Sequence, residues 1–215
     1  MTGARTLVLL RHGRTAWNEV GRAQGQADIE LDEVGHAQAA GVAPYIAAME
    51  PATLWTSDLA RARQTCAYVE EATGLSAKAD ERLREFDVGI RQGLTNQEFA
   101  EAFPAEAAGW VVGAGMLQIE GAESTADVAA RLVPALREHL DSLAPGETGV
   151  VVTPGASLKV GLAGLLGWPE QLSTTLQGME NCGWAVMGEI EPGGRVRLVA
   201  YNRQAGPSGG GLTDL

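Results

Sequence analysis

The sequence predicts an α/β fold, a three-layer sandwich with a mostly parallel central sheet, helices on both faces and a helical insertion over the cleft. Strands alternate with helical segments along most of the chain, which is typical of parallel sheets. Residues 149–153 (GVVVT) form a continuous, largely β-branched run of the kind that is buried in such a sheet. With 215 residues and 45% hydrophobic content, the chain is large enough to bury a substantial core.

The N-terminal part is expected to hold three short strands and two helices. The strands are predicted at residues 7–10, 53–56 and 77–79, and the helices at residues 32–49 and 59–73. Asp32 is the expected cap of the first helix, and Pro44 is expected to kink or break it. Gly74 is the expected end of the second helix. The polar, glycine-containing residues 18–30 are predicted to form a loop.

The C-terminal part is expected to begin with the helical insertion, at about residues 86–147. Capping-box patterns start at Thr95 and at Ser124, and the second helix should run toward Leu143 with Pro134 inside it. The remaining elements are a strand at 149–153, a helix at 154–167, and strands at 182–190 and 195–202 on either side of a hairpin signal. We expect residues 1–204 to form a single domain and residues 205–215 to be a flexible tail.

The composition limits the partners that this chain can have. It carries 16 Lys and Arg against 27 Asp and Glu, a net charge of −11, which argues against nucleic acid and anionic membranes. An anion could still bind if a few cations gather in one cleft. Cys66 and Cys182 lie far apart and indicate neither a disulfide framework nor a zinc site. With no signal-type N-terminus and no membrane-spanning apolar run, we expect a cytoplasmic protein.

Chemically useful residues follow four of the real or apparent strands. The four segments are Arg11-His12-Gly13, Ser57-Asp58-Leu59-Ala60-Arg61-Ala62, Leu83-Arg84-Glu85 and Thr153-Pro154-Gly155-Ala156-Ser157. Ligands of such folds bind beyond the carboxyl ends of the strands, so the four segments are expected to meet in one crevice. Two guanidiniums, an imidazole and a carboxylate would suit a phosphoryl group there, and two helix N-termini would add backbone donors.

These segments, in this order, make the chain resemble the histidine phosphatase superfamily, the phosphoglycerate mutase-like family with an RHG motif. The resemblance covers the chain from Leu7 to about Asn202. The residues that carry the resemblance are Arg11-His12-Gly13-Arg14-Thr15 with Asn18, the segment 57–65, Leu83-Arg84-Glu85 with Gly89 and Gly93-Leu94-Thr95, and Glu123-Ser124. The resemblance implies a phosphomonoester hydrolase that acts on a small phosphorylated metabolite or binds inorganic phosphate.

The resemblance also implies the roles of individual residues. His12 is the implied nucleophile, which becomes a phosphohistidine, and Glu85 is the implied acid that protonates the leaving oxygen. The implied phosphate site consists of Arg11, Asn18, Arg61, Gly13 and Thr15. Guanidiniums beside the imidazole should lower the pKa of His12 and keep it nucleophilic. No metal and no cofactor is implied.

One position departs from the family pattern. The family has a second histidine in a Thr-His-Gly context, whereas this chain has Thr153-Pro154-Gly155. Proline offers no side-chain donor and no backbone N–H. Loss of one preorganised donor typically costs about 10²–10³ in rate, so we expect hydrolysis to be impaired. The fold should tolerate Pro154, because proline suits the start of a helix. The sequence leaves open whether Pro154 is natural or was introduced.

Other candidate residues are interpreted as structural. His36 and His139 are predicted to be solvated helix residues, and their spacing does not match a zinc pair. A cationic rim could be extended by Arg14, Arg22, Arg63 and Arg84, but surface or helix-face positions are predicted for them. Core or cleft-wall positions are predicted for Trp17, Trp55, Trp110, Trp168 and Trp184. Cys66 is expected to be buried. Glu85 could alternatively do no more than pair with Arg82 or Arg84.

Alternative functions are kept open. A non-catalytic phospho-ligand or partner-binding protein would keep the site without turnover. A phosphoglycerate mutase-type phosphotransferase would return the phosphoryl group from His12 to its substrate, although the chain is short for such a mutase. The resemblance extends to actinobacterial glucosyl-phosphoglycerate phosphatases through residues 178–184 and Tyr201-Asn202, which suggests that substrate. A homodimer is left open.

Overall fold

A six-stranded sheet forms the centre of the computed structural model, which describes residues 3–111, 119–169, 172, 175–191 and 193–206. The strands are β1 (Thr6–Arg11), β2 (Thr53–Thr56), β3 (Lys78–Ala79), β4 (Thr148–Thr153), β5 (Trp184–Glu189) and β6 (Val196–Arg203). Their spatial order is β3-β2-β4-β1-β5-β6. The first four strands of that order pair in parallel, whereas β5 and β6 are antiparallel. The predicted mostly parallel sheet is confirmed.

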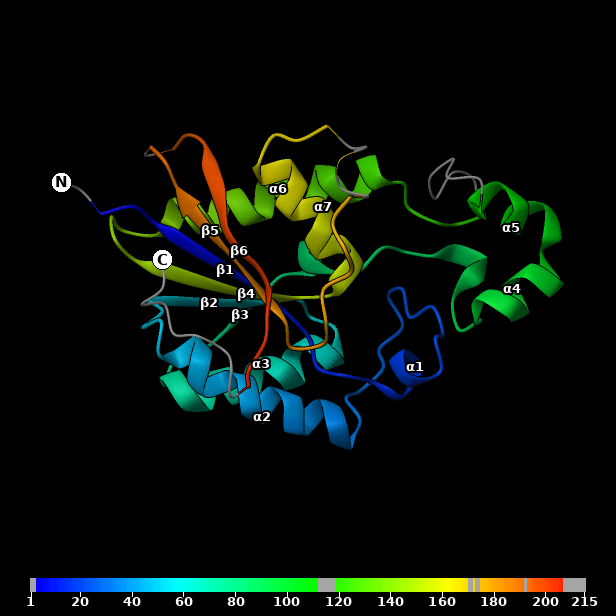
Figure 1. Ribbon diagram of the computed structural model, residues 1–215, viewed down its shortest axis with the longest axis horizontal. Coiled ribbons are helices and arrows are strands. Elements are labelled where there is room, and N and C mark those ends of the chain that lie inside the picture. The colour runs from blue at the N-terminus through cyan, green and yellow to red at the C-terminus, as the bar shows by residue number, and fades with distance from the viewer. Residues whose placement is uncertain (1–2, 112–118, 170–171, 173–174, 192, 207–215) are drawn as a thin grey trace.

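Helices cover both faces of this sheet (Figure 1). The helices are α1 (Ala16–Glu19), α2 (Glu33–Ala47), α3 (Ala60–Thr73), α4 (Asn96–Ala102), α5 (Pro104–Val111), α6 (Thr125–Ser142) and α7 (Gly155–Leu165), with 3-10 turns η1 (Glu81–Leu83) and η2 (Gly89–Arg91). Leu7 and Leu9 of β1 pack with the buried residues of α6 and α7. Val8 and Leu10 pack with α2 and α3 on the other face. This alternation confirms the predicted three layers.

The carboxyl ends of the parallel strands point toward α1, α4 and α5 (Figure 1). The described side chains of α4 and α5 do not belong to either core beside the sheet. Phe99 of α4 and Ala107 of α5 pack with Ile119 in a small apolar cluster of their own. Residues 112–118 of the predicted insertion lie outside the described residues, as do residues 207–215 of the predicted tail. The division into one domain with a tail stays a prediction.

Two of the described helices run through an internal proline. Helix α2 continues through Pro44 to its last residue, Ala47, so the expected break at this proline is wrong. Helix α6 runs through Pro134 to Ser142, and the helix predicted to contain this proline is confirmed. Within the described ranges, no helix combines the length and the apolar character that crossing a membrane requires.

Most of the predicted buried residues are in place. Cys66 is buried on α3, as predicted, and Trp55 and Trp184 lie in the two cores. Trp17 and Trp168 are half-buried. The side chain of Trp110 lies outside the described part of the chain.

The prediction that His139 is solvated is wrong. Its side chain is 0% exposed and stacks on the Trp55 ring, with 4.6 Å between the ring centroids. Its Nε2 lies 2.6 Å from Thr53 Oγ1. The spacing of His139 from Leu132 and Leu136 places it on the apolar face of α6, a signal that the sequence already contained. His36 is half-buried, with Nδ1 3.1 Å from the Tyr68 hydroxyl, so it is not fully solvated either.

Burial lowers the pKa of His139 from 6.5 to about 4. The unfolded chain therefore binds a proton more readily than the folded one between these pH values, and the free energy of unfolding should fall as the pH falls through this window. At pH 5 we expect a loss of about 2 kcal/mol relative to pH 7, by the usual conversion of pKa differences. Urea unfolding at both pH values checks this, with His139→Gln as the variant that cannot titrate. Equal pH dependence in the two proteins would contradict the assignment.

Candidate active site

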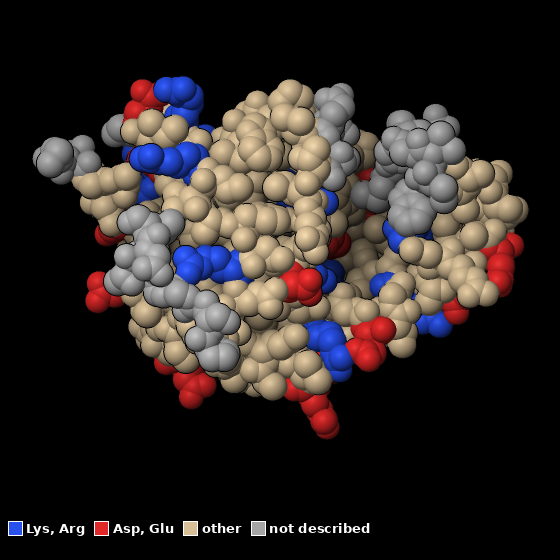
Figure 2. Space-filling model, viewed as in Figure 1, with Lys and Arg blue, Asp and Glu red and all other residues tan. Residues whose placement is uncertain are grey.

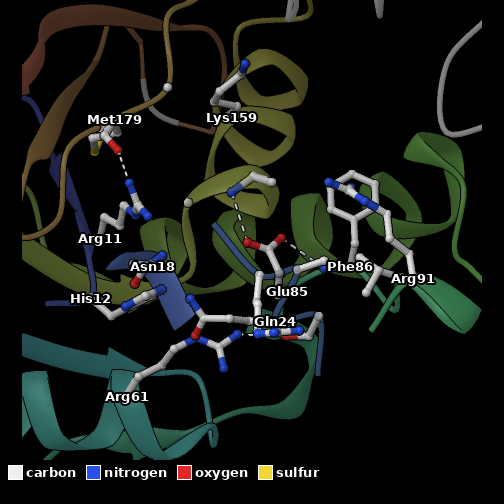
Figure 3. Close-up of a pocket in the computed structure, with 17 residues that line it drawn as sticks. Arg11, His12, Asn18, Gln24, Arg61, Glu85, Phe86, Arg91, Lys159 and Met179 are labelled. Carbon is white, nitrogen blue, oxygen red and sulfur yellow. Dashed lines mark hydrogen bonds between the residues drawn. The ribbon is translucent and has the colours of Figure 1, made fainter. Parts of the chain in front are cut away.

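A cavity of about 340 Å³ lies beyond the carboxyl ends of the parallel strands. Its walls include Arg11, His12, Asn18, Gln24, Arg61, Glu85, Phe86, Arg91, Gly155, Ala156, Lys159 and Met179 (Figure 3). The cavity thus brings together side chains that follow β1, β2 and η1 with the first residues of α7. The four segments expected to meet in one crevice all have a residue in its wall.

His12 lies directly after β1 and is 3% exposed. Its Nδ1 is 2.6 Å from the Gly13 carbonyl oxygen. Because a carbonyl can only accept, the neutral ring carries its proton on Nδ1 and leaves the Nε2 lone pair available. Burial, and then the charges of Arg61 and Arg11, hold the pKa of His12 well below 6.5. The ring is therefore neutral at pH 7 and can act as a nucleophile.

Two buried guanidiniums accompany this imidazole. Arg61, in the first turn of α3, is 1% exposed and donates to the carbonyl oxygens of Gly25 and Ala27, both at 2.8 Å. Arg11 donates to the Met179 carbonyl oxygen. Among the described residues, neither Arg11 Nε nor Arg61 Nε has a hydrogen-bond partner. A guanidinium carries five donors, so both side chains retain donors for an anion.

Gly155 allows Arg11 to lie against the start of α7. A Cβ atom on Gly155 would stand 2.8 Å from Arg11 Nε and 3.0 Å from Arg11 Cδ, closer than such atoms normally approach. This close approach explains why a glycine is needed at this position.

The substitution Gly155→Ala should therefore push the Arg11 guanidinium away from the cavity. We expect inorganic phosphate to bind about tenfold more weakly, in line with the loss of a hydrogen bond to a charged group. Isothermal titration calorimetry with inorganic phosphate measures the change. Gly41→Ala in α2 is the matched control, because a Cβ there would meet open space. Unchanged phosphate affinity in Gly155→Ala would show that Arg11 does not hold the anion.

Glu85 lies between η1 and η2, and the backbone of α7 holds its carboxylate. Oε1 accepts hydrogen bonds from Phe86 N at 2.9 Å and Ser157 N at 2.8 Å, and Oε2 accepts one from Ala156 N at 3.0 Å. Glu85 thereby caps the N-terminus of α7, where the N-cap residue Pro154 makes no side-chain hydrogen bond.

The alternative in which Glu85 only neutralises a neighbouring arginine is wrong. Arg84 forms its hydrogen bonds with Asp58, at 2.5–3.1 Å. Arg82 pairs instead with Asp80, at 2.6 Å, and with Glu138, at 2.8 Å. The carboxylate of Glu85 is therefore left facing the cavity and the start of α7 (Figure 3).

The remaining predicted phosphate ligands divide into two groups. Asn18 lines the cavity, and its Oδ1 accepts a hydrogen bond from the backbone N–H of Thr15 at 3.1 Å. The N–H₂ group of its amide takes no part in that hydrogen bond. Gly13 and Thr15 are not among the lining residues. The N–H of Gly13 donates to Thr65 Oγ1 at 2.9 Å, and Thr15 is buried as the N-cap of α1. The structure therefore places these two behind the cavity wall, where they shape the turn after β1.

Sequence reasoning did not assign four polar or charged residues of the cavity wall to the site. These are Arg22, Gln24, Arg91 and Lys159. Arg22 was assigned to the surface, and it does form an ion pair with Glu98 at 2.6 Å. Gln24 is 9% exposed and its Oε1 has no hydrogen-bond partner among the described residues. Lys159 could have been found, because it lies four residues after Gly155 and therefore on the same face of α7.

The cavity is basic although the protein is acidic. Among the described residues, five arginines and lysines line it against the single carboxylate of Glu85, whereas the whole chain has a net charge of −11. Figure 2 shows basic side chains in the hollow between the main body and the part that holds α4 and α5. Such a local concentration of cations attracts an anionic ligand. Within the described part of the chain, no three histidine, cysteine or acidic side chains are grouped so that they could hold a metal ion.

Comparison with known proteins places this site in a family. The sequence profile of the histidine phosphatase superfamily (branch 1) matches residues 7–203. A relative from Mycobacterium tuberculosis (strain CDC 1551 / Oshkosh), named glucosyl-3-phosphoglycerate phosphatase, is 36% identical over 94% of this chain and 96% of its own. A Cronobacter sakazakii protein named "Probable phosphoglycerate mutase" is 34% identical over 81% of this chain and 80% of its own.

The similarity extends to solved structures. A mycobacterial glucosyl-3-phosphoglycerate phosphatase in complex with VO3 superimposes with a TM-score of 0.85. The two chains are 34% identical, and the match covers 93% of this chain and 99% of the other. Sequence profile, relatives and fold agree over nearly the whole length, and this chain belongs to the histidine phosphatase superfamily.

Proposed function

We propose that this chain is a phosphoric monoester hydrolase that acts on a small phosphorylated metabolite through a phosphohistidine at His12. The observation that carries the proposal is the buried, neutral imidazole of His12, with its Nε2 free, beside two guanidiniums that keep unused donors. The named phosphatases among the relatives support a hydrolase. A similar structure that binds VO3 supports an oxyanion as the ligand.

The proposed reaction has two steps. His12 Nε2 attacks phosphorus in line, and the bond between phosphorus and the leaving oxygen breaks as the N–P bond forms. Protonated Glu85 gives its proton to the leaving oxygen. Glu85 then takes a proton from a water molecule, whose oxygen attacks phosphorus and breaks the N–P bond. Arg11, Arg61 and Asn18 hold the non-bridging oxygens in both steps, and the two guanidiniums balance their charge.

We further propose that Pro154 slows this reaction. It stands where the family resemblance leads us to expect a histidine, and it presents no donor to the transferring phosphoryl group. This absence of a donor favours the second candidate function, a phospho-ligand-binding protein with little or no turnover.

The outer part of the cavity supports a substrate with a second negative charge. Figure 3 shows Arg91 on the side of Glu85 that faces away from His12, and Lys159 above it on α7. Lys159 is half-buried and forms no ion pair with any described residue. A carboxylate would suit such a lysine. The relative's named substrate, glucosyl-3-phosphoglycerate, carries one, and we propose a substrate of this chemical class. A cytoplasmic location and a homodimer stay predictions.

A phosphate-release screen tests the proposed function. The panel contains glucosyl-3-phosphoglycerate, 3-phosphoglycerate, glycerol 3-phosphate and p-nitrophenyl phosphate, and acid-quench labelling of His12 is run on each active substrate. Release of phosphate together with a labelled histidine supports the hydrolase. Calorimetric binding of the esters without label or release supports the binding protein. Movement of the phosphoryl group between two positions of a phosphoglycerate supports the phosphotransferase.

A further inference from the structure

The segment that carries Glu85 lies between η1 and η2 and is not a strand of the sheet, so side chains must provide hydrogen-bond partners for its backbone carbonyls. Arg131, on α6, provides most of them. Its Nη1 donates to the carbonyl oxygens of Arg82 at 2.9 Å and Arg84 at 2.8 Å, and its Nη2 donates to that of Glu85 at 2.8 Å. One guanidinium therefore fixes the backbone on the N-terminal side of the Glu85 side chain.

Glu123 fixes the same segment on its C-terminal side. Its Oε2 accepts the backbone N–H of Asp87 at 2.8 Å, and its own N–H donates to the Asp87 carbonyl oxygen at 2.9 Å. Arg131 Nε and Nη2 donate to the two carboxylate oxygens of Glu123, both at 2.8 Å. Arg131 and Glu123 thus form one unit that contacts the chain before and after Glu85.

This unit is largely closed to solvent and fully hydrogen-bonded at the arginine. The side chains of Arg131 and Glu123 are 19% and 22% exposed. All five N–H donors of Arg131 have an acceptor, which lysine, with three donors at a single nitrogen, could not reproduce. Burial raises the pKa of Glu123, but the hydrogen bonds from Arg131 and Asp87 outweigh it and bring that pKa below its ordinary value.

We propose that Arg131 and Glu123 are positioning residues for Glu85, which they hold at the depth in the cavity where its carboxyl group can pass a proton to the leaving oxygen. This inference rests on the proposed function, because it takes Glu85 as the acid. Neither residue lines the cavity, so both act through the backbone. The N–H groups of Ala156 and Ser157 locate the carboxylate from the opposite side. Glu85 is therefore held between α6 and α7.

A positioning role differs measurably from a merely structural one. Proton transfer by a general acid matters for an alkyl phosphate, whose leaving alkoxide is strongly basic, and matters little for p-nitrophenyl phosphate, whose leaving group is a stable anion. The second step, in which Glu85 is the base, is common to both substrates and does not enter kcat/KM. A displaced Glu85 should therefore lower kcat/KM only for the first substrate. A general loss of folded protein would slow both equally.

The experiment measures kcat/KM for glycerol 3-phosphate and p-nitrophenyl phosphate in Arg131→Lys and Glu123→Gln. We expect kcat/KM for glycerol 3-phosphate to fall about 10- to 100-fold, because small displacements of a catalytic group have effects of this size. We expect kcat/KM for p-nitrophenyl phosphate to change by less than about threefold, because phosphorylation of His12 by this substrate needs little acid catalysis. Glu85→Gln should show the same selective loss in a stronger form.

The matched control is Arg5→Lys. Arg5 also bridges two elements, since it donates to the Leu140 carbonyl oxygen at 3.1 Å and pairs with the buried Glu189 at 3.2 Å. It has no contact with the segment that carries Glu85. Its replacement should lower the thermal unfolding midpoint without separating the two substrates.

Each outcome decides the inference. Equal losses on both substrates, or no loss on either, would overturn the positioning role while the hydrolase stands. The alkyl phosphate of the screen that is hydrolysed fastest replaces glycerol 3-phosphate where the latter is not a substrate. If the unaltered chain hydrolyses no ester of the screen, the proposed function fails and the inference fails with it. If Arg131→Lys does not fold, as judged by circular dichroism, Glu123→Gln decides, because its amide keeps the volume and one oxygen acceptor of the carboxylate.

Discussion

Replacement of His12 by alanine is expected to lower phosphomonoester hydrolysis by about 10⁴-fold or more, since removal of a covalent nucleophile typically has effects of this size. The imidazole is buried and its Nε2 is the one ring nitrogen not engaged with the Gly13 carbonyl. No other described histidine reaches the cavity, because His36 and His139 are not among its lining residues. The measurement is phosphate release together with acid-quench labelling, and both signals should disappear.

Binding of inorganic phosphate should survive this replacement within about tenfold, because the guanidiniums of Arg11 and Arg61 provide most of the charge-assisted hydrogen bonds. His36→Ala is the matched control: His36 is half-buried beside Tyr68, remote from the cavity, and its loss should leave hydrolysis unchanged. Hydrolysis that persists in His12→Ala would mean that another group, or water directly, attacks phosphorus. The phosphohistidine would then have no place in the mechanism.

The features of the fold that depend on short stretches of sequence were predictable. The run of β-branched residues in β4 and the Ser124 capping box are local signals, and the elements begin and end close to the predicted residues. Arg11, His12, Arg61 and Glu85 could be grouped because parallel strands deliver their carboxyl ends to one edge of the sheet. The chain order of these residues was therefore enough to place them in one cavity.

Features that depend on the relative placement of distant segments were not predictable in the same way. Arg131 and Glu123 are eight residues apart, and no spacing rule for one helix pairs them; their contact depends on how α6 begins. The three carbonyls that Arg131 binds belong to the 3-10 turn η1 and to the irregular segment after it. Gln24 reaches the cavity from a loop whose path no periodic pattern specifies. Such contacts follow from tertiary packing rather than from local propensity.

Replacement of Pro154 by histidine is expected to raise phosphomonoester hydrolysis by about 10²–10³-fold, the usual contribution of one preorganised donor to a developing oxyanion. Pro154 is the N-cap of α7, next to the glycine against which Arg11 lies. A donor at this position would stand beside the guanidinium that is proposed to hold the phosphoryl oxygens. The measurement is kcat/KM for p-nitrophenyl phosphate and for the best substrate of the phosphate-release screen.

The backbone at this position can accept the histidine without strain. Pro154 has φ −67° and ψ 165°, a conformation open to any residue. Removing the proline should cost no more than about 1 kcal/mol of stability, through the greater freedom of the unfolded chain. Glu85 already caps α7 through the N–H groups of Ala156 and Ser157, so the helix does not depend on the side chain at 154.

The variant Pro154→Ala distinguishes the effect of the missing side-chain donor from the effect of the proline ring itself. Alanine restores the backbone N–H and removes the pyrrolidine ring, but it supplies no side-chain donor. Because only a preorganised donor provides the larger effect, the hydrolysis rate of this variant should stay within about threefold of that of the unaltered chain. A gain in both variants would assign the low rate to the shape of the proline rather than to the missing imidazole. A gain in neither would mean that the remaining groups around His12 already complete the site, and the proposed impairment would be wrong.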